Sequence, residues 1–407
     1  MRILVVTQFR RKVGGIETYL ATIVPALNNS GHELGICYEF EGPQDREPLE
    51  FPGEILQWPI MNFGKTAVLA QITCWHPDLV FCHGFSDLEF ESQLLKLAPG
   101  IFYAHNYHGT CVSGTKTRKF PTAAPCSRTF GLGCLFQYYP RRCGGLNPAT
   151  MLKRYKGEGE RLRLLRDYAA IVTNSEYLAR EYRHHGLNAR CLYLFTHDQQ
   201  SDVLPSPPLE SNAAKLLFVG RMDRLKGGQL LLEALPEIRA RVGRDLQLTF
   251  IGDGPDRGAW QKKAEKMQTH SGIRIEFRGW LTKSHLAQQY ADADLLVVPS
   301  LWPEPFGLVG IEAGFHGLPA VAFSVGGIPE WLHDSENGYL AQGDPPTPEE
   351  LARASAQALD PKNHQRLRVG AKEAAQRWTV EKHYVDLNHL LQNTINGSEP
   401  PTLVPAH

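Results

Sequence analysis

Short apolar runs rich in β-branched and aromatic residues alternate with helical patterns along nearly the whole chain, and this alternation constrains the fold most. In the first half, strands are predicted over 2–7, 34–38, 79–82, 101–104 and 170–173. In the second half, they are predicted over 216–219, 246–251, 273–277, 294–298 and 320–323. Strands separated by helices form parallel sheets that helices cover. The sequence therefore predicts an α/β fold.

A chain of 407 residues is too long for one ordinary hydrophobic core, so two domains are expected. A stretch rich in proline and serine, 201–214, is the clearest linker. It separates a first domain, 1–200, from a second, 215–378, and both are predicted to be Rossmann-like and to face a cleft. Residues 379–395 form a last helix, and 396–407 form a tail.

Charge is balanced overall, with 43 Lys and Arg against 43 Asp and Glu, but it is not evenly distributed. Residues 116–166 hold twelve basic residues and two acidic ones, Glu158 and Glu160. This stretch is either a solvated basic surface or a patch that meets anionic lipid head groups or a lipid-diphosphate acceptor. No apolar run reaches the roughly 18–20 residues of a membrane span, and the N-terminus lacks a signal-peptide pattern. We expect a cytoplasmic protein, peripheral at the cytoplasmic face of a membrane if the patch binds lipid.

An insertion at 108–147 interrupts the α/β pattern and is rich in Gly, Pro, Cys and Arg. Four of the eight cysteines fall in it: Cys111, Cys126, Cys134 and Cys143. In a reducing compartment four thiolates can hold a structural zinc ion. The spacing contains no C-x-x-C pair, so buried or disulfide-linked cysteines are the alternative.

The stretch Pro299–Glu330 carries two carboxylates around the start of a predicted helix. Glu304 precedes this helix and Glu312 lies within it. The main-chain N–H groups and the dipole at a helix N-terminus favour a bound anion. A second loop, after the strand at 216–219, contains Arg221 and Lys226 followed by two glycines. Arginine binds two phosphate oxygens at once and lysine adds a point charge, so this loop is typical of a diphosphate site.

Seven short pieces that occur in order give the chain a family resemblance. They are Gly14-Gly-Ile-Glu17, Gly220-Arg221…Lys226-Gly227, Gly252-Asp-Gly-Pro255, Phe277-Arg-Gly279, Glu304-Pro-Phe-Gly307…Glu312, Gly317-Leu-Pro319 and Gly326-Gly-Ile-Pro-Glu330. Because it contains all seven pieces in this order, the chain resembles the retaining glycosyltransferases of family 4, which have the two-domain GT-B fold. The resemblance implies that the first domain is the acceptor side, that the second binds a nucleotide sugar, and that the last helix crosses back onto the first domain.

The resemblance also implies roles for individual residues. Glu304 would contact the donor sugar and stabilise charge at the anomeric carbon, and Glu312 would bind the ribose. Arg221 and Lys226 would neutralise the leaving diphosphate. Main-chain N–H groups would help to hold the donor at Phe306, Gly307 and Leu308. Across the cleft, Gly15 would allow close approach to the phosphates and His105 would lie near the donor sugar, although Asn106 follows it where many relatives have aspartate.

We therefore expect a hexosyltransferase that moves a sugar from a UDP- or GDP-sugar to a glycan, lipid-linked or small-molecule acceptor, as in polysaccharide biosynthesis. Front-face attack is the implied route, without a cofactor or a catalytic divalent metal, and nucleic acid is not an expected partner. Two alternatives remain open from the residues. One is a nucleotide-sugar epimerase on the same fold, and the other is a non-catalytic nucleotide-binding scaffold of a glycan-synthesis complex.

Overall fold

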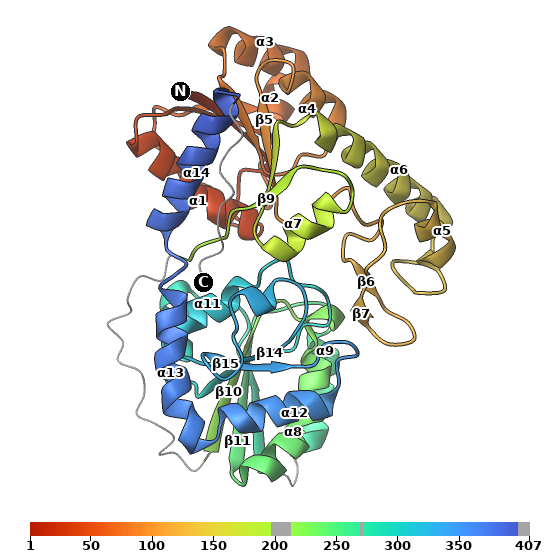
Figure 1. Ribbon diagram of the computed structural model, residues 1–407, viewed down its shortest axis with the longest axis vertical. Helices are drawn as coiled ribbons and strands as arrows, with labels where there is room; N and C mark the ends of the chain where they lie inside the picture. The colour runs from red at the N-terminus through yellow and green to blue at the C-terminus, as the bar shows by residue number, and fades with distance from the viewer. Residues whose placement is uncertain (197–212, 269–271, 398–407) are drawn as a thin grey trace.

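The computed structural model describes residues 1–196, 213–268 and 272–397, which form two α/β units stacked along the long axis of the molecule (Figure 1). Each unit is built on a parallel sheet, as predicted. The seven-stranded sheet comprises, in spatial order, β3 (Leu56–Pro59), β2 (Glu33–Phe40), β1 (Arg2–Phe9), β4 (Leu79–Cys82), β5 (Gly100–Ala104), β8 (Ala170–Thr173) and β9 (Ala189–Cys191). The six-stranded sheet comprises β12 (Ile273–Phe277), β11 (Asp245–Ile251), β10 (Ala213–Val219), β13 (Leu295–Val298), β14 (Ala320–Phe323) and β15 (Gly338–Ala341).

Helices cover both sheets. Those of the first unit are α1 (Gly15–Asn29), α2 (Ile60–Phe63), α3 (Lys65–Trp75), α4 (Leu88–Leu94), α6 (Pro148–Leu164) and α7 (Glu176–Arg183). Those of the second are α8 (Gly228–Val242), α9 (Arg257–Gln268), α10 (Lys283–Asp292), α11 (Leu308–Phe315), α12 (Pro348–Ala358) and α13 (Pro361–Ala375). The described residues also contain three short 3₁₀ helices: η1 (Leu165–Asp167), η2 (Arg224–Lys226) and η3 (Ile328–Glu330).

The strand order fixes where each unit can bind a ligand. In the first sheet the order reverses between β1 and β4, and in the second it reverses between β10 and β13. Loops that leave the carboxyl ends of the two strands at such a point diverge to opposite faces and open a crevice. In the second unit these two loops are the ones that carry Arg221 and Lys226, after β10, and Glu304, after β13.

Three strands of the two parallel sheets were not predicted, and all three are edge strands. They are β3, β9 and β15, of four, three and four residues. A strand that pairs on one side only tolerates a proline such as Pro59 or a glycine such as Gly338, and it need not be long. The periodic apolar signal that identifies central strands is therefore weak in them.

The insertion is more regular than its composition predicted. It contains a two-stranded antiparallel sheet, β6 (Thr117–Arg118) with β7 (Ala124–Pro125), and a short helix, α5 (Leu132–Tyr138). We call residues 108–156, which add the first half of α6, the insertion lobe; it projects sideways from the first sheet (Figure 1). Helix α6 supplies part of the basic stretch 116–166; it ends at Leu164, and η1 follows.

Parts of the predicted linker and tail, 201–212 and 398–407, lie outside the described residues. The last two residues of the predicted linker, Ala213 and Ala214, belong to β10.

The last helix, α14 (Val380–Ile395), leaves the second unit and lies along α1 of the first (Figure 1). His383 anchors it. One ring nitrogen of His383 lies 2.6 Å from the main-chain oxygen of Tyr193, and the other lies 2.9 Å from the hydroxyl of Tyr19 on α1. Farther along the helix, His32 Nε2 lies 3.2 Å from Asn388 Oδ1. The chain therefore returns to the first unit through α14, and a buried polar contact between His383 and Tyr19 holds the helix there.

His383 should make stability depend on pH, because burial lowers its pKa to about 4. The unfolded chain protonates this ring near pH 6.5, so unfolding takes up a proton as the pH falls from about 6.5 to 4. The native state should therefore be destabilised in this window, at up to about 1.4 kcal/mol per pH unit for this ring. Urea unfolding of the parent and of His383→Gln between about pH 7.5 and 4.5 covers most of this window, and the free energy of unfolding should change less steeply with pH in the variant.

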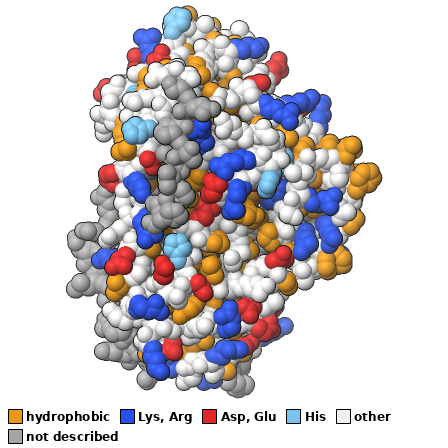
Figure 2. All heavy atoms as spheres, viewed as in Figure 1, with side chains coloured by type: hydrophobic (Ala, Val, Ile, Leu, Met, Phe, Trp, Pro, Cys, Tyr) orange, Lys and Arg blue, Asp and Glu red, His pale blue; other side chains and the backbone are white. Residues whose placement is uncertain are grey.

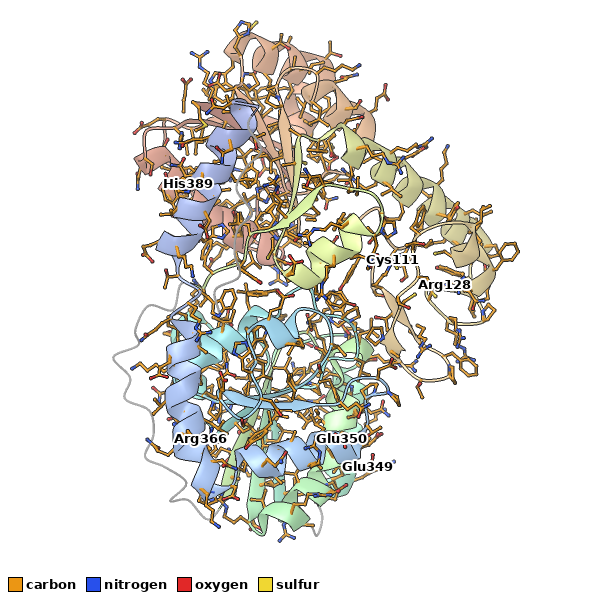
Figure 3. All side chains as sticks on the ribbon, viewed as in Figure 1. Cys111, Arg128, Glu349, Glu350, Arg366 and His389 are labelled. Carbon is orange, nitrogen blue, oxygen red and sulfur yellow. The ribbon has the colours of Figure 1, made fainter. Side chains whose placement is uncertain are left out.

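His389 provides the control for this measurement. It lies exposed on the same helix and is marked in Figure 3. His389→Gln should keep the slope of the parent protein. Equal slopes for the parent and His383→Gln would contradict the assignment of a buried neutral ring.

Candidate active site

A lysine–glutamate pair joins the two loops at the strand-order reversal of the second sheet. Lys226 Nζ lies 2.5 Å from Glu304 Oε1, although the residues are 78 positions apart in the chain. The Ser300 hydroxyl donates to the same oxygen at 2.5 Å. The Glu304 side chain is 7% exposed and that of Lys226 is 27% exposed, so the carboxylate is enclosed while the ammonium still reaches solvent. Because an ammonium has three donors, Lys226 keeps capacity for a second anion.

The loop that presents Lys226 is shaped by its neighbours. Asp223 accepts hydrogen bonds from the main chain of Leu225 and Lys226, at 2.9 and 3.3 Å, and so starts the turn η2. Gly227 follows with φ 72°, and a Cβ there would lie 1.8 Å from the carbonyl oxygen of Pro299. Only glycine fits this close approach. The contact places Lys226 directly against the loop of Glu304.

Arg221 lies on the same loop and is the more accessible cation. Its side chain is 69% exposed, and its nearest acidic partner, Asp223, is 3.9 Å away. An ion pair at this distance holds an exposed guanidinium only weakly. Arg221 is therefore available to bind a phosphate.

Helix α11 begins where the sequence indicated, with Gly307 as its N-cap in the left-handed region (φ 91°). Gly307 and Leu308 are partly exposed residues, whereas Phe306 is buried in the core, with its ring centroid 5.2 Å from that of Trp378. Phe306 therefore contributes only its main chain to any ligand. Glu312 lies one turn and a half into the helix and accepts a hydrogen bond from the Tyr290 hydroxyl at 3.0 Å.

The loop of Glu304 also touches the first unit. The Tyr107 hydroxyl donates to the carbonyl oxygen of Pro303 at 2.6 Å. At the other end of the stretch, Glu330 accepts main-chain hydrogen bonds from Glu176 (2.8 Å) and Tyr177 (2.7 Å), the first residues of α7. Burial raises the pKa of the Glu330 carboxyl, and these two N–H groups oppose the rise. Sequence reasoning assigned no role to Tyr107 or Glu330, although Glu330 closes a recognised motif.

Two histidines occupy the carboxyl ends of neighbouring strands in the first unit. His83 follows β4 and His105 follows β5, and His83 Nδ1 lies 3.1 Å from His105 Nε2. Burial lowers the pKa of His105 to about 3 and holds that of His83 well below its usual value. Both rings are neutral at physiological pH. Among the described residues His83 Nε2 has no hydrogen-bond partner.

A cavity of about 480 Å³ opens at this edge of the first sheet. Gly15 at the start of α1 lines it, and a side chain built there would meet nothing within 4 Å, so the loop leaves room for a ligand. Polar side chains from β4, β5 and α6 line the rest: His83, Ser86, Asn106, His108, Glu158 and Arg161. The cavity therefore offers both hydrogen-bond donors and acceptors.

The four cysteines of the insertion lobe line a second cavity, of about 220 Å³. The charges of Cys126, Cys111 and Cys134 add to burial in raising the pKa of Cys143 to about 11, so the thiols lie close enough to interact. All four are free thiols. In the described ranges, however, no three His, Cys, Asp or Glu side chains take an arrangement that could hold a metal ion.

The chain also contains one Asp-x-Asp sequence, Asp292-Ala293-Asp294, next to β13. Asp294 is buried and accepts the main-chain N–H of Lys215 at 2.8 Å, while Asp292 accepts from Gln288 at 2.9 Å. Both carboxylates thus have structural partners within the second unit.

Two family descriptions match the chain, "Glycosyltransferase Family 4" over residues 13–194 and "Glycosyl transferases group 1" over residues 213–360. Together they span most of its length, one on each sheet. The chain belongs to the family 4 glycosyltransferases.

Among the curated relatives of this family 4 glycosyltransferase is a D-inositol 3-phosphate glycosyltransferase of Streptomyces bingchenggensis, 35% identical over 179 residues. The match covers 41% of this chain and 37% of the relative, so it spans little more than a third of that protein. An uncharacterized glycosyltransferase of Methanocaldococcus jannaschii is 33% identical over 146 residues, 35% of each chain.

Solved structures share the fold over nearly the whole chain. Sucrose-phosphate synthase from Thermosynechococcus elongatus superposes with a TM-score of 0.70 at 19% identity, covering 98% of this chain and all of that one. Anabaena Alr3699/HepE in complex with UDP and glucose gives 0.66 at 19% identity, covering 96% and 99%. These neighbours confirm the GT-B fold. None of the helices in the described ranges has the length and apolar character needed to cross a membrane.

Gly326 offers a test of how the Glu304 loop is held. A Cβ at Gly326 (φ 63°) would lie 2.2 Å from the Glu304 carbonyl oxygen and 2.4 Å from its nitrogen. Gly326→Ala should therefore lower the free energy of unfolding by about 1–3 kcal/mol and lower turnover, because the Glu304 main chain must move. Thermal unfolding and nucleotide-sugar turnover measure the two effects.

Gly258→Ala is the matched control, since a Cβ at this α9 position meets nothing within 4 Å. It should be neutral or stabilise by up to about 1 kcal/mol. If both variants behaved alike, the close contact between Gly326 and Glu304 would not position the loop.

Proposed function

We propose that this chain transfers a sugar from a nucleotide-diphosphate sugar, a UDP-sugar or a GDP-sugar, to an acceptor hydroxyl, with retention at the anomeric carbon. The observation that carries the proposal is the Lys226–Glu304 pair at the strand-order reversal of the second sheet, with its carboxylate enclosed and its ammonium open to solvent. A diphosphate leaving group is stabilised by a cation and by a helix N-terminus, which Lys226 and the start of α11 provide. A sugar that develops positive charge is stabilised by a carboxylate, which Glu304 provides. UDP is bound in the Anabaena neighbour of the same fold, which favours UDP as the nucleotide to try first.

The donor would be held by groups from three elements of the second unit. Arg221 and the unused donors of Lys226 would neutralise the diphosphate, and the main-chain N–H groups at Gly307 and Leu308 would add the positive end of α11. Glu304 would stabilise the charge that develops at the anomeric carbon. Glu312, within α11, would bind the ribose hydroxyls.

The acceptor would enter through the cavity of the first unit. His83 lines this cavity and His105 lies directly behind it, with His83 Nδ1 3.1 Å from His105 Nε2. Burial keeps both rings neutral, so they would help to orient a hydroxyl without adding positive charge. In front-face transfer the leaving phosphate takes the acceptor proton, so no protein base is needed.

A glycan, a lipid-linked glycan and a small-molecule acceptor would each present the required hydroxyl. One structural neighbour, TarM from Staphylococcus aureus, was solved with fondaparinux, α-GlcNAc-glycerol and UDP.

A panel of nucleotide sugars, with mixed acceptors, tests the proposal. We expect release of free UDP or GDP together with a glycosylated acceptor, both read by mass spectrometry. Glu304→Gln should lower kcat about 100-fold or more, because a preorganised charge at the reacting centre is lost. Lys226→Met should weaken nucleotide binding, measured by calorimetry with UDP or GDP alone.

A second lysine–glutamate pair supplies matched controls. Lys263 and Glu233 form an ion pair on the surface between α9 and α8, with 32% and 40% exposed side chains. Glu233→Gln and Lys263→Met should keep the kcat and the affinity of the parent. Unchanged turnover in Glu304→Gln would overturn its role. An isomerised nucleotide sugar would indicate an epimerase, and nucleotide binding without any product would indicate a non-catalytic scaffold.

We also propose that the four-cysteine cavity binds a structural zinc ion once its thiols move into a ligating arrangement, which they do not have in the described residues. Two features support this: the four thiols converge on one cavity, and the apolar cluster of the insertion lobe has only three buried members, Val112, Tyr138 and Met151. So small a core is usually reinforced by a metal or by disulfides.

Elemental analysis of the purified protein should give about one zinc per chain, the number that four thiolate ligands imply. Cys126→Ser should reduce the zinc content, while Cys74→Ser, at an exposed cysteine on α3, should leave it unchanged. Zinc well below one per chain, with all eight thiols reactive after denaturation, would contradict the site. Four reactive thiols would instead indicate two disulfides.

A further inference from the structure

The insertion lobe exposes apolar side chains to an extent that the rest of the described surface does not. Leu146 and Phe136 are 80% and 78% exposed, more than any other large apolar side chain in the described residues. Four others in the lobe are also exposed: Phe120, Leu132, Tyr139 and Leu152. Large exposed apolar groups gathered on one element indicate an interaction surface.

The same lobe is strongly basic. The sequence contains no Asp or Glu between Glu91 and Glu158, a gap that includes the entire lobe. Its exposed cations are Arg128, Arg142, Lys153, Arg154 and Lys156. Figure 2 shows apolar and basic side chains interspersed on the projecting lobe, and Figure 3 marks Arg128 out on the lobe and Cys111 near its base. The charge has no acidic counterpart within the lobe itself.

We propose that the insertion lobe docks on the surface of a bilayer that contains anionic lipids. An interface of this kind takes up both sets of groups, because apolar side chains enter the boundary of the acyl chains while Lys and Arg remain among the anionic head groups. A nucleic acid would satisfy the cations but would leave Leu146 and Phe136 without an apolar environment. The exposed apolar groups therefore favour lipid.

Helix α6 connects this surface to the cavity proposed for the acceptor. Its first half, including Leu152 and Lys153, belongs to the docking surface, and its next turns line the cavity through Gly157, Glu158 and Arg161. Docking would hold the cavity near the membrane interface, within reach of a hydroxyl carried on a membrane-anchored acceptor. This consequence for the acceptor rests on the proposed function, whereas docking itself does not.

Flotation of the full chain with vesicles tests the docking directly. We expect the protein to float with vesicles of phosphatidylcholine and phosphatidylglycerol, to float much less with phosphatidylcholine alone, and to be released by high salt. Leu132→Ser/Phe136→Ser and Lys153→Gln/Lys156→Gln should each lower the partition coefficient roughly tenfold. Both variants should still release nucleotide from the donor with a water-soluble acceptor.

Exposed side chains elsewhere serve as controls. Trp280→Ser removes a 62% exposed aromatic side chain from the second unit, and Lys362→Gln/Lys372→Gln removes two exposed lysines from α13, on the opposite side of the molecule from α5 (Figure 1). Both controls should float like the parent.

Equal flotation with neutral and anionic vesicles, or equal losses in the lobe variants and the controls, would overturn the proposal. Flotation needs no donor or acceptor, so a protein that does not float would leave the proposed transferase activity unaffected. A protein that floats but transfers no sugar would support docking and contradict the proposed activity.

Discussion

The contact between Gly326 and the main chain of Glu304 is the constraint on which the donor half of the site depends. The loop of Glu304 lies directly against the turn at Gly326 and Gly327, and Gly327 N–H donates to the Glu304 carbonyl oxygen at 2.8 Å. With the main chain fixed from this side, the Glu304 carboxylate reaches Ser300 and Lys226 on the other. The geometry of the Lys226–Glu304 pair therefore depends on Gly326, because a side chain at this position would displace the main chain of Glu304.

The same stretch is also held by the first unit, so the site is shared between the two sheets. Tyr107 binds the carbonyl of Pro303, next to Glu304, and Glu330 occupies the N-terminus of α7. Separating the units would leave two N–H groups of α7 without their carboxylate, and hydrogen bonds to a charged group contribute about 1.5–3 kcal/mol each. Closure of the units and positioning of Glu304 are thus linked, because a single segment, 303–330, carries both.

The parts of the structure that depend on local pattern could be predicted from the sequence, and those that depend on how the units meet could not. Central strands such as β1 and β13 have continuous apolar runs, and the loops that follow β10 and β13 had to lie together once the sheet was parallel. The sequence assigned Lys226 and Glu304 to one donor site only through the family resemblance, and the strand order then showed that their loops are neighbours. Tyr107 and Glu330 had no such signal, because their partners lie 196 and about 154 positions away, in the other unit. Phe306 was expected to offer only its main-chain N–H to the donor, and the burial of its ring is compatible with that expectation.

The distribution of charge gives each half of the site a different task. In the second unit the loop after β10 carries two cations, Arg221 and Lys226, at the crevice where a diphosphate would lie. In the first unit burial keeps His83, His105 and His383 neutral, so no imidazolium competes for that anion or for the proton of an acceptor hydroxyl. The cavity of the first unit does contain Arg161, but this cation is paired with Glu91. Under the proposed function, the leaving diphosphate would be stabilised by the cations of the second unit, and the neutral histidines of the first would leave its oxygens basic enough to receive the acceptor proton.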